Sequence, residues 1–568
     1  MEDKCSADML DESTILPWDR FSNWIYCVAV VTFDIEIGQS IEHIYPSHIK
    51  LTEREKTNIC YLAFPDSNSG CMGDTNFHFR TRLCSMRRRS VSIHNEYNRN
   101  CFVSQQADPS YFYGFVYFRQ VKDKTARRGY FQKSVVLLSR LPFFCLYSHV
   151  VSLIAPDFFE FGVSALETAC REIDKWQPPV PGTVVNLPLM DRLIRVQIPH
   201  KNENLSSLTL IESLPSQLQK TNLIQPCSTL ASLYELNIFK CFLPIISHVQ
   251  LLWELVLTSE PILVMAPTPD TCSEMVQSLV STIWPLRFAS DFRPFFTIHD
   301  SEFKEYTTKT QAPPPVILGV TNPFFGKTLQ HWPHIIRIGE YGNQSSNLKL
   351  HSAGNVNSLD CKPGVYTKYK PFLQKDRSIL KKLLKGMESK RPPEVQIVLL
   401  RRYFMELTQS FLMPLERYLT SLMPLQKIIS PYKATPLFPP FNPEEFLKTL
   451  ETSGPQLTSG IKGDWSGLYK RFFRSPNFSS WYECRYEEVD QALKVLHIKA
   501  ISEANLLEWI ANKAEVEIVD LVLKIKEKLT AVEKERLPVT HDTVSKLESR
   551  LKDVINSLPD DLQQILLK

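Results

Sequence analysis

The sequence predicts a protein of several modules in mixed classes: an α+β module first, an α/β module next and an all-helical module last. Three observations predict this organisation. The first third of the chain reads strand, strand, helix, three strands, two helices, the middle alternates strands with helices, and helical periodicity dominates after Tyr369. The length of 568 residues suggests roughly two to four domains.

The first module is expected over residues 23–180, behind a tail of residues 1–22. Trp24–Phe33 is rich in β-branched and aromatic residues, which is typical of a buried strand, and a second strand ends at Tyr45. Thr52 and Glu55 have the spacing of a capping box, so a helix should follow through Tyr61. The sequence therefore begins with two strands and a helix.

The rest of this module indicates an antiparallel sheet covered by helices. Thr75–Arg82 alternates as a half-buried strand does, and Tyr111–Val121 with Tyr130–Ser139 predicts a hairpin around a polar turn. After Pro142 the pattern becomes helical up to Trp176. An antiparallel sheet with helices packed on it is the simplest arrangement of these elements.

The Pro-rich run Gln177–Gly182 marks a module boundary. Residues 181–232 are expected to hold a connecting strand pair (Val184–Pro199) and a polar linker, and residues 233–340 a layered α/β module. In that module a helix is expected around Ile245–Val256 and another after a capping box at Thr271 and Glu274. Strands are expected at Pro261–Pro267, Pro294–His299, Pro315–Val320 and Ile335–Ile338.

Residues 341–368 are polar and contain glycine, so we expect a linker, and residues 369–568 are expected to form the all-helical module. Long helical patterns support this, among them Glu394–Leu422 and Val516–Leu529.

Composition argues against several classes of protein. With 65 basic and 61 acidic residues the net charge is only +4, so nucleic acid is not an expected main partner. The 13 cysteines are scattered without a C-x-x-C pair, which predicts reduced thiols in a cytosolic protein and neither a disulfide framework nor a metal site. Polar residues such as Glu254 interrupt the apolar stretch Leu243–Ala266, and we expect no membrane span or signal peptide.

No recognisable catalytic motif is present, and no cofactor is expected. Gly319–Thr328 ends like a phosphate-binding loop, but six residues separate its glycines where four are needed, and Pro323 removes a backbone donor. We therefore expect a strand, a loop and a helix there. His299–Asp300 lacks a nucleophile of recognisable context and is interpreted as structural.

The run Arg87–Arg89 precedes Ser90 and Ser92 in a polar stretch. Such a run is either a solvated loop, a phosphorylation site at these serines, or a patch for anionic lipid, and the sequence does not separate the three.

Several longer stretches resemble one family. They are Phe33–Pro46, Tyr111–Gln120, Arg128–Lys133, Asp291–Tyr306, Ile317–Phe325, Leu329–Arg337, Leu399–Phe404 and Ile461–Trp465. Together they closely resemble the DENN domain-containing protein 6 subfamily over nearly the whole chain. The resemblance implies a three-part DENN architecture, with a longin-like first module, a central α/β module and a helical downstream module.

The resemblance also implies that the chain is a guanine-nucleotide exchange factor for a Rab GTPase of endosomal recycling. It would be peripheral on recycling endosomes through that GTPase and would have no covalent chemistry of its own. From position and polarity, Asp34, Gln39, Glu42 and Asn322 are candidate GTPase contacts; the alternative is that they form surface turns or strand-end hydrogen bonds. A non-catalytic Rab effector or trafficking scaffold would have the same surface and stays open.

Overall fold

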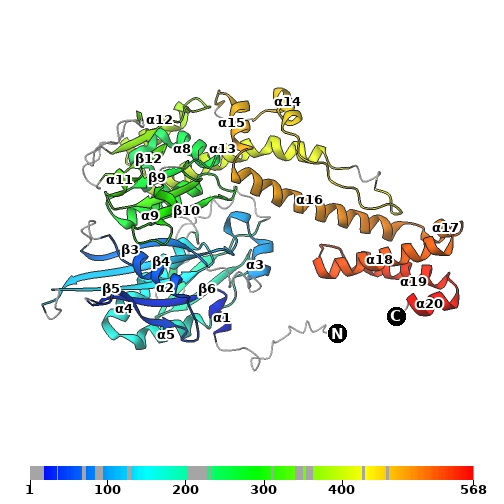
Figure 1. The fold of residues 1–568 in the computed structure, drawn as a ribbon, viewed down its shortest axis with the longest axis horizontal. Coiled ribbons are helices and arrows are strands. Elements are labelled where there is room, and N and C mark those ends of the chain that lie inside the picture. Colours follow the sequence, from blue (N-terminus) through cyan, green and yellow to red (C-terminus); the bar gives the residue numbers. More distant parts are fainter. Residues whose placement is uncertain are drawn as a thin grey trace. The chain divides into compact units, whose positions relative to one another are not determined.

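A computed structural model shows how the elements are arranged (Figure 1). It describes residues 18–34, 36–66, 72–83, 94–124, 129–201, 227–230, 232–233, 236–308, 312–339, 350–352, 363–424, 429–455, 460–535 and 537–566.

The chain divides into two compact units. The first takes in the described residues of Met1–Gln409 and Leu457–Asn477, and the second those of Ser410–Gln456 and Phe478–Lys568. The helical segment after Tyr369 thus begins inside the first unit. The module limits expected from the sequence remain predictions.

The first unit opens with a five-stranded sheet in the order β2-β1-β5-β4-β3, in which every neighbouring pair is antiparallel. Its strands are β1 (Cys27–Asp34), β2 (Gly38–Tyr45), β3 (Gly73–Arg82), β4 (Tyr111–Lys122) and β5 (Tyr130–Ser139). All five strands, and the β4–β5 hairpin, were predicted. The short helices α1 (Asp19–Ser22) and α3 (Asn95–Asn100) were not.

Side chains alternate between the two faces of this sheet, as the pleat requires. On β4, Phe112 and Phe118 join the core beneath helix α2 (Glu53–Leu62), whereas Phe115 packs against Tyr147 of helix α4 (Phe144–Phe161) on the opposite face. Helix α5 (Val163–Ile173) follows α4. The predicted capping box is present: Thr52 accepts from the Glu55 amide, and the Glu55 carboxylate accepts from the Thr52 amide.

A small sheet follows, with β7 (Arg192–Gln197) between β6 (Val184–Leu189) and β8 (Cys227–Thr229). The pair β6–β7 is the strand pair expected from the sequence. Residues 202–226 of the expected polar linker lie outside the described residues.

The central sheet has six strands in the order β10-β11-β9-β12-β14-β13, with β12–β14 as its antiparallel pair. Its strands are β9 (Ile262–Met265), β10 (Asp291–Arg293), β11 (Val316–Val320), β12 (His334–Arg337), β13 (Leu350–Ser352) and β14 (Gly364–Thr367). Its helical segments are α7 (Ile238–Phe242), η7 (Leu243–His248), α8 (Val249–Leu257), α9 (Pro269–Ser281), α10 (Phe303–Thr307) and α11 (Phe325–Thr328). The α/β class expected for this part is therefore observed.

Two details of the central prediction were wrong. The capping box expected at Thr271 and Glu274 lies inside α9, which begins two residues earlier at Pro269, because proline is well suited to the first turn of a helix. The strand expected at Pro294–His299 is absent from these described residues: the short strand β10 ends at Arg293, and the segment after it consists of bends and turns.

One apolar helical run, Ile238–Leu257, is long enough to cross a membrane by length and composition, and it is the only such run in the described residues. Within its most apolar window, 83% is buried inside the protein, which is what a core helix of a folded domain shows.

The remaining helices are α12 (Arg377–Glu388), α13 (Pro393–Ser421), α14 (Pro443–Ser453), α15 (Trp465–Phe472), α16 (Pro476–Glu503), α17 (Leu506–Ile510), α18 (Glu515–Glu535), α19 (His541–Asn556) and α20 (Asp560–Leu566). Asp376, Asn442 and Asp464 cap their helices through side-chain oxygens, so local sequence fixes these starts. In the second unit α17, α18 and α19 share an apolar core that includes Leu506, Val522 and Leu547. The helical C-terminal region is thus confirmed.

Candidate functional site

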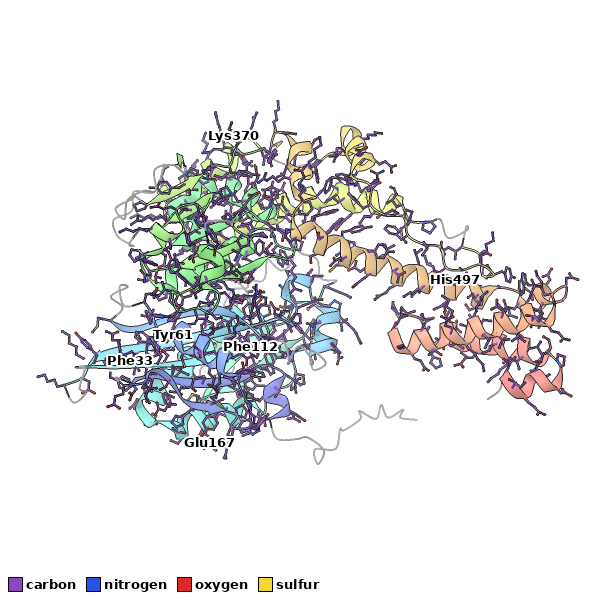
Figure 2. All side chains as sticks on the ribbon, in the orientation of Figure 1. Phe33, Tyr61, Phe112, Glu167, Lys370 and His497 are labelled. Atoms are coloured by element: carbon purple, nitrogen blue, oxygen red, sulfur yellow. The ribbon has the colours of Figure 1, made fainter. Side chains whose placement is uncertain are left out.

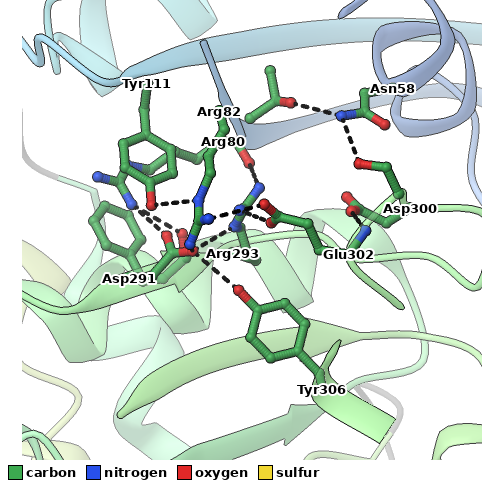
Figure 3. A network of polar contacts seen from close by, with 12 residues as sticks. Asn58, Arg80, Arg82, Tyr111, Asp291, Arg293, Asp300, Glu302 and Tyr306 are labelled. Atoms are coloured by element: carbon green, nitrogen blue, oxygen red, sulfur yellow. Dashed lines mark hydrogen bonds and ion pairs between the residues drawn. The ribbon is translucent and has the colours of Figure 1, made fainter. Parts of the chain in front are cut away.

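A buried network of charged side chains joins the first sheet to the central sheet (Figure 3). Arg80 of β3 donates to the carboxylates of Asp108 and Asp291, both at 2.8 Å, and Asp291 lies on β10. Arg293, also on β10, donates to Asp291 at 3.0 Å and to Glu302. The network therefore fastens an edge strand of each sheet to the other.

Aromatic rings and a further arginine complete the network. The guanidinium of Arg80 lies 3.5 Å from the centre of the Tyr111 ring, and Tyr306 donates its hydroxyl hydrogen to Asp291 at 3.2 Å. Arg82 reaches Glu302 at 3.2 Å from a more exposed position. Bidentate and stacked contacts of this kind require arginine rather than lysine.

Two carboxylates of this network, Asp108 and Asp291, have lowered pKa values, whereas burial raises the pKa of Glu302. Burial would raise the pKa of Asp291, but Arg293 and Arg80 beside it hold that pKa below its usual value. Burial acts likewise on Asp108, whose pKa Arg80 lowers. Removing one member of such a network leaves an uncompensated buried charge, so its geometry is tightly constrained.

Apolar packing supports the same junction. Phe77 of β3 meets Phe295 of the segment after β10, with ring centres 5.2 Å apart, and Ser273 of α9 accepts from the amide of His78 at 3.4 Å. Gly319 of β11 permits that segment to pass, because a Cβ there would stand 2.3 Å from the Pro294 carbonyl oxygen. The two sheets are therefore packed together along β3.

The sheet register identifies a set of strand ends that share one end of the first sheet. Asp34 pairs with Gly38, Thr32 with Lys133, and Gln120 with Gly73. The end of β1, the start of β2, the start of β5, the end of β4 and the start of β3 therefore lie at one end of the sheet, which we call the hairpin end.

A second polar contact joins the central module to the segment that follows α2. Ala63, just after α2, accepts from Ser134 in the middle of β5. Asp66 then accepts from the hydroxyl of Thr321, at 2.7 Å, where β11 ends. Burial raises the pKa of Asp66, although that bond opposes the rise. The loop between β11 and α11 is thereby tied to the segment that follows α2.

Apolar side chains stand exposed in both segments. Ile37, in the β1–β2 turn, is 79% exposed, and Phe324, in the loop between β11 and α11, is 49% exposed. Met72, Val121 and Tyr130, at the other strand ends, are also exposed. Exposed large apolar side chains that form a patch with a polar rim are typical of a protein-binding surface.

The four candidate contact residues lie in these two segments or on the strand that follows the β1–β2 turn. The Asp34 carboxylate accepts from the amides of Glu36 and Ile37, at 2.7 and 3.0 Å, and these bonds lower its pKa. Asn322 accepts from the Phe324 amide at 3.0 Å. Both therefore make local turn hydrogen bonds, the alternative set out from the sequence, and both shape loops that present exposed apolar groups.

The other two candidates lie on the edge strand β2. Gln39 pairs with Phe33, and Glu42 forms an ion pair with Lys133 of β5 at 2.7 Å. The register between β1 and β2 shifts at Val30 and Val31, which leaves Glu42 as the extra residue of a β-bulge.

The two segments with a catalytic appearance in the sequence, His299–Asp300 and Gly319–Thr328, have structural surroundings. His299 is exposed and stacks on Tyr61 with ring centres 4.6 Å apart, while Asp300 accepts from the Glu302 amide. Gly319–Thr328 forms β11, a loop and the short helix α11. No group of three or more His, Cys, Asp or Glu in the described ranges is placed to hold a metal ion. Ser90 and Ser92 lie outside the described residues.

Comparisons with known proteins identify the chain. Residues 25–164, which contain the first sheet, match the family described as transport protein Avl9, and residues 506–568 match the DENND6 C-terminal domain. Protein DENND6A of Gallus gallus is 54% identical over 98% of this chain and 95% of its own length, and protein DENND6B of Homo sapiens 52% identical over 97% and 94%. A DENND6 homolog of Dictyostelium discoideum is 32% identical over 92% of this chain and 79% of its own length.

These matches define a DENN-domain protein. Within that class, the chain belongs to the DENND6 family. The resemblance drawn from the sequence stretches is thereby confirmed.

Sequence reasoning missed the network that joins the sheets. Arg80, Asp108 and Glu302 are separated by up to 222 positions, and nothing in their local pattern marks them as partners. The one available signal was the Asp291-Phe-Arg293 run, an alternation of opposite charges on a short strand beside an apolar module.

Proposed function

We propose that this protein is a guanine-nucleotide exchange factor for a Rab-family small GTPase. The proposal is carried by membership of the DENND6 family over almost the whole chain, together with the exchange activity that the family resemblance implies. It is supported by the exposed apolar side chains at the hairpin end and in the loop between β11 and α11. Nucleotide exchange does not require a catalytic residue on this chain.

Exchange requires binding energy rather than covalent chemistry. A GTPase holds its nucleotide through its phosphate loop, Mg²⁺ and ordered switch segments. A protein that binds the nucleotide-free form more tightly than the loaded form shifts the equilibrium toward release. A tenfold acceleration of release corresponds to a barrier to release that is lower by about 1.4 kcal/mol.

The hairpin end, together with the loop between β11 and α11, is the surface we propose for the GTPase. Ile37 is exposed at the hairpin end and Phe324 in the loop, and the hydrogen bond from Thr321 to Asp66 ties that loop to the segment after α2. A rigid surface favours one conformation of a mobile switch at low entropic cost. Asp34 and Asn322 would then act by shaping the two loops, and Gln39 and Glu42 would border them.

We further propose the recycling endosome as the place of action, with the GDP-bound and nucleotide-free GTPase as partners and the cytoplasm as the soluble pool. Loss of endosomal localisation on depletion of the GTPase would support recruitment through that partner. Unchanged localisation would count against it.

The competing function is a non-catalytic effector or scaffold. An effector uses the same kind of surface but prefers the GTP-loaded form. Affinity measured for GDP-loaded, GTP-loaded and nucleotide-free GTPase separates the two functions.

The experiment that tests the proposal is release of a fluorescent GDP analogue from a panel of purified Rab proteins, with and without the full chain. Acceleration of one or a few members by tenfold or more is the expected result. Binding to a GTP-loaded Rab without any acceleration across the panel would replace the exchange factor with an effector.

A further inference from the structure

Helix α12 and its flanking segments carry an unusual concentration of positive charge. Residues 368–391 hold nine basic and two acidic side chains, a net charge of +7, whereas the whole chain carries +4. The basic residues are Lys368, Lys370, Lys375, Arg377, Lys381, Lys382, Lys385, Lys390 and Arg391. The rest of the chain is therefore slightly acidic, and the positive charge is local.

All nine basic side chains are exposed. In the part of the chain that the structure describes, none of them forms an ion pair, so no carboxylate of the fold neutralises their charge. Of the two acidic residues, Asp376 is buried and caps the start of α12, which leaves Glu388 as the exposed carboxylate of the stretch. Figure 2 shows Lys370 at the outer margin of the first unit.

Helix α12 holds four of these basic residues on one face. Arg377, Lys381 and Lys385 follow one another at four-residue spacing, and Lys382 lies beside them. The opposite face is buried through Ile379 and Leu383.

Close packing fixes the orientation of α12. Gly386 lies so near α13 that a Cβ there would fall 1.9 Å from the Gln396 side chain. The helix cannot roll without opening that contact, so the cationic face stays turned outward.

The shape of this surface indicates what it meets. A phosphate-binding pocket would have basic groups converging on one point, but here they are spread along a convex helix and its two flanks. Flexible lysines spread over a convex face suit a broad, fluid surface of negative charge, and seven of the nine residues are lysine.

We propose that α12 and its flanks, residues 368–391, form a membrane-binding surface that recognises anionic lipid bilayers by charge. Long lysine stems allow the ammonium groups to reach phosphate and carboxylate headgroups without insertion of the helix. This contact is additional to any recruitment by a GTPase, and it does not depend on the proposed exchange activity. It would hold one fixed face of the first unit against the bilayer.

The test is co-sedimentation of the full chain with vesicles of phosphatidylcholine alone and of phosphatidylcholine containing one part in four phosphatidylserine. Binding is expected only to the anionic vesicles, and it should weaken steeply from 0.1 to 0.5 M salt because exposed charges are screened. Each basic group in reach of the bilayer contributes about fivefold. The variant R377Q/K381Q/K382Q/K385Q should therefore bind at least about tenfold more weakly.

A matched variant controls for net charge. K304Q/K448Q/K499Q/K552Q removes an equal number of positive charges, four, from exposed lysines on α10, α14, α16 and α19. This variant should bind the vesicles like the unaltered chain. K381R/K382R/K385R, which keeps the charge, should also bind normally. Circular dichroism of each variant confirms folding.

Three results would overturn the proposal. They are an absence of binding to anionic vesicles, equal weakening by both glutamine variants, and binding to soluble polyglutamate with none to vesicles. The last would assign the surface to an acidic protein segment instead. Because no GTPase is present, failure here is separate from failure of the exchange proposal.

Discussion

Arginine 80 offers the sharpest test of how the two sheets are joined. Its side chain is 7% exposed, and it donates to Asp108 and Asp291 at 2.8 Å while stacking on Tyr111. Arg80→Ala would remove the ion-pair partner of Asp108. Asp291 would keep its ion pairs with Arg293 and Arg82. Breaking a buried pair on one side costs about 3–5 kcal/mol of unfolding free energy.

A neighbouring strand supplies the control. Arg119 of β4 donates to Asp74 at 2.7 Å, but this pair is partly exposed, so Arg119→Ala should cost at most about 1 kcal/mol. In the double variant R80A/D108N the second change removes the stranded carboxylate, so the loss should be smaller than the sum of the two single losses.

The assay is urea unfolding followed by tryptophan fluorescence, since seven of the nine tryptophans lie in the first unit. Arg80 lowers the pKa of Asp108, so its benefit is present above the ordinary carboxylate range and is lost as pH falls. The gap between the parent chain and Arg80→Ala should therefore narrow below about pH 4. Equal losses of unfolding free energy for Arg80→Ala and Arg119→Ala at neutral pH would refute the role of the charged network in joining the two sheets.

Three further predictions concern other parts of the first unit. Burial raises the pKa of Glu254 to about 7, above its unfolded value, so the folded state loses stability as pH rises toward 8. Glu254→Gln should therefore flatten the change in melting temperature between pH 5.5 and 8. The same pH dependence of the melting temperature in this variant as in the parent chain would be contrary evidence. Gly319→Ala forces a Cβ to within 2.3 Å of a backbone oxygen and should cost about 2 kcal/mol or more in urea unfolding, whereas Gly326→Ala, with 3.5 Å of clearance, should be nearly neutral. Ile37→Asp and Phe324→Asp, at exposed sites, should leave the melting temperature within about 2 °C while lowering GTPase affinity by tenfold or more in titration calorimetry.

Much of the local structure could be predicted from the sequence. Strands such as β1 and β9 are short apolar runs between clear boundaries, and the helix at Glu53 begins with a capping box that local residues alone complete. The predictions that failed were also local. Pro269 starts α9 ahead of the expected cap, and the apolar segment after β10 is buried by tertiary packing on Phe77 rather than by strand pairing.

The site was less predictable, because it depends on contacts between distant segments. Asp66 and Thr321 are 255 positions apart, and only the folded chain shows that they hold two loops together. Asp34 and Asn322 are polar residues in turns, as their sequence positions predict. Their polarity does not indicate that the nearby Ile37 and Phe324 are exposed. A single sequence carries no signal that separates an exposed isoleucine from a buried one in a short turn.

The central claim is that the hairpin end and the loop between β11 and α11 together promote nucleotide release from a Rab GTPase. The most direct test compares fluorescent GDP release from the most responsive Rab with the unaltered chain, with Ile37→Asp/Phe324→Asp, and with Val184→Asp, which places a charge at an exposed apolar site on β6. We expect strong acceleration by the unaltered chain and by Val184→Asp, and at least tenfold less by the double variant. Full acceleration by the double variant, or none by the unaltered chain on any Rab tested, would contradict the claim.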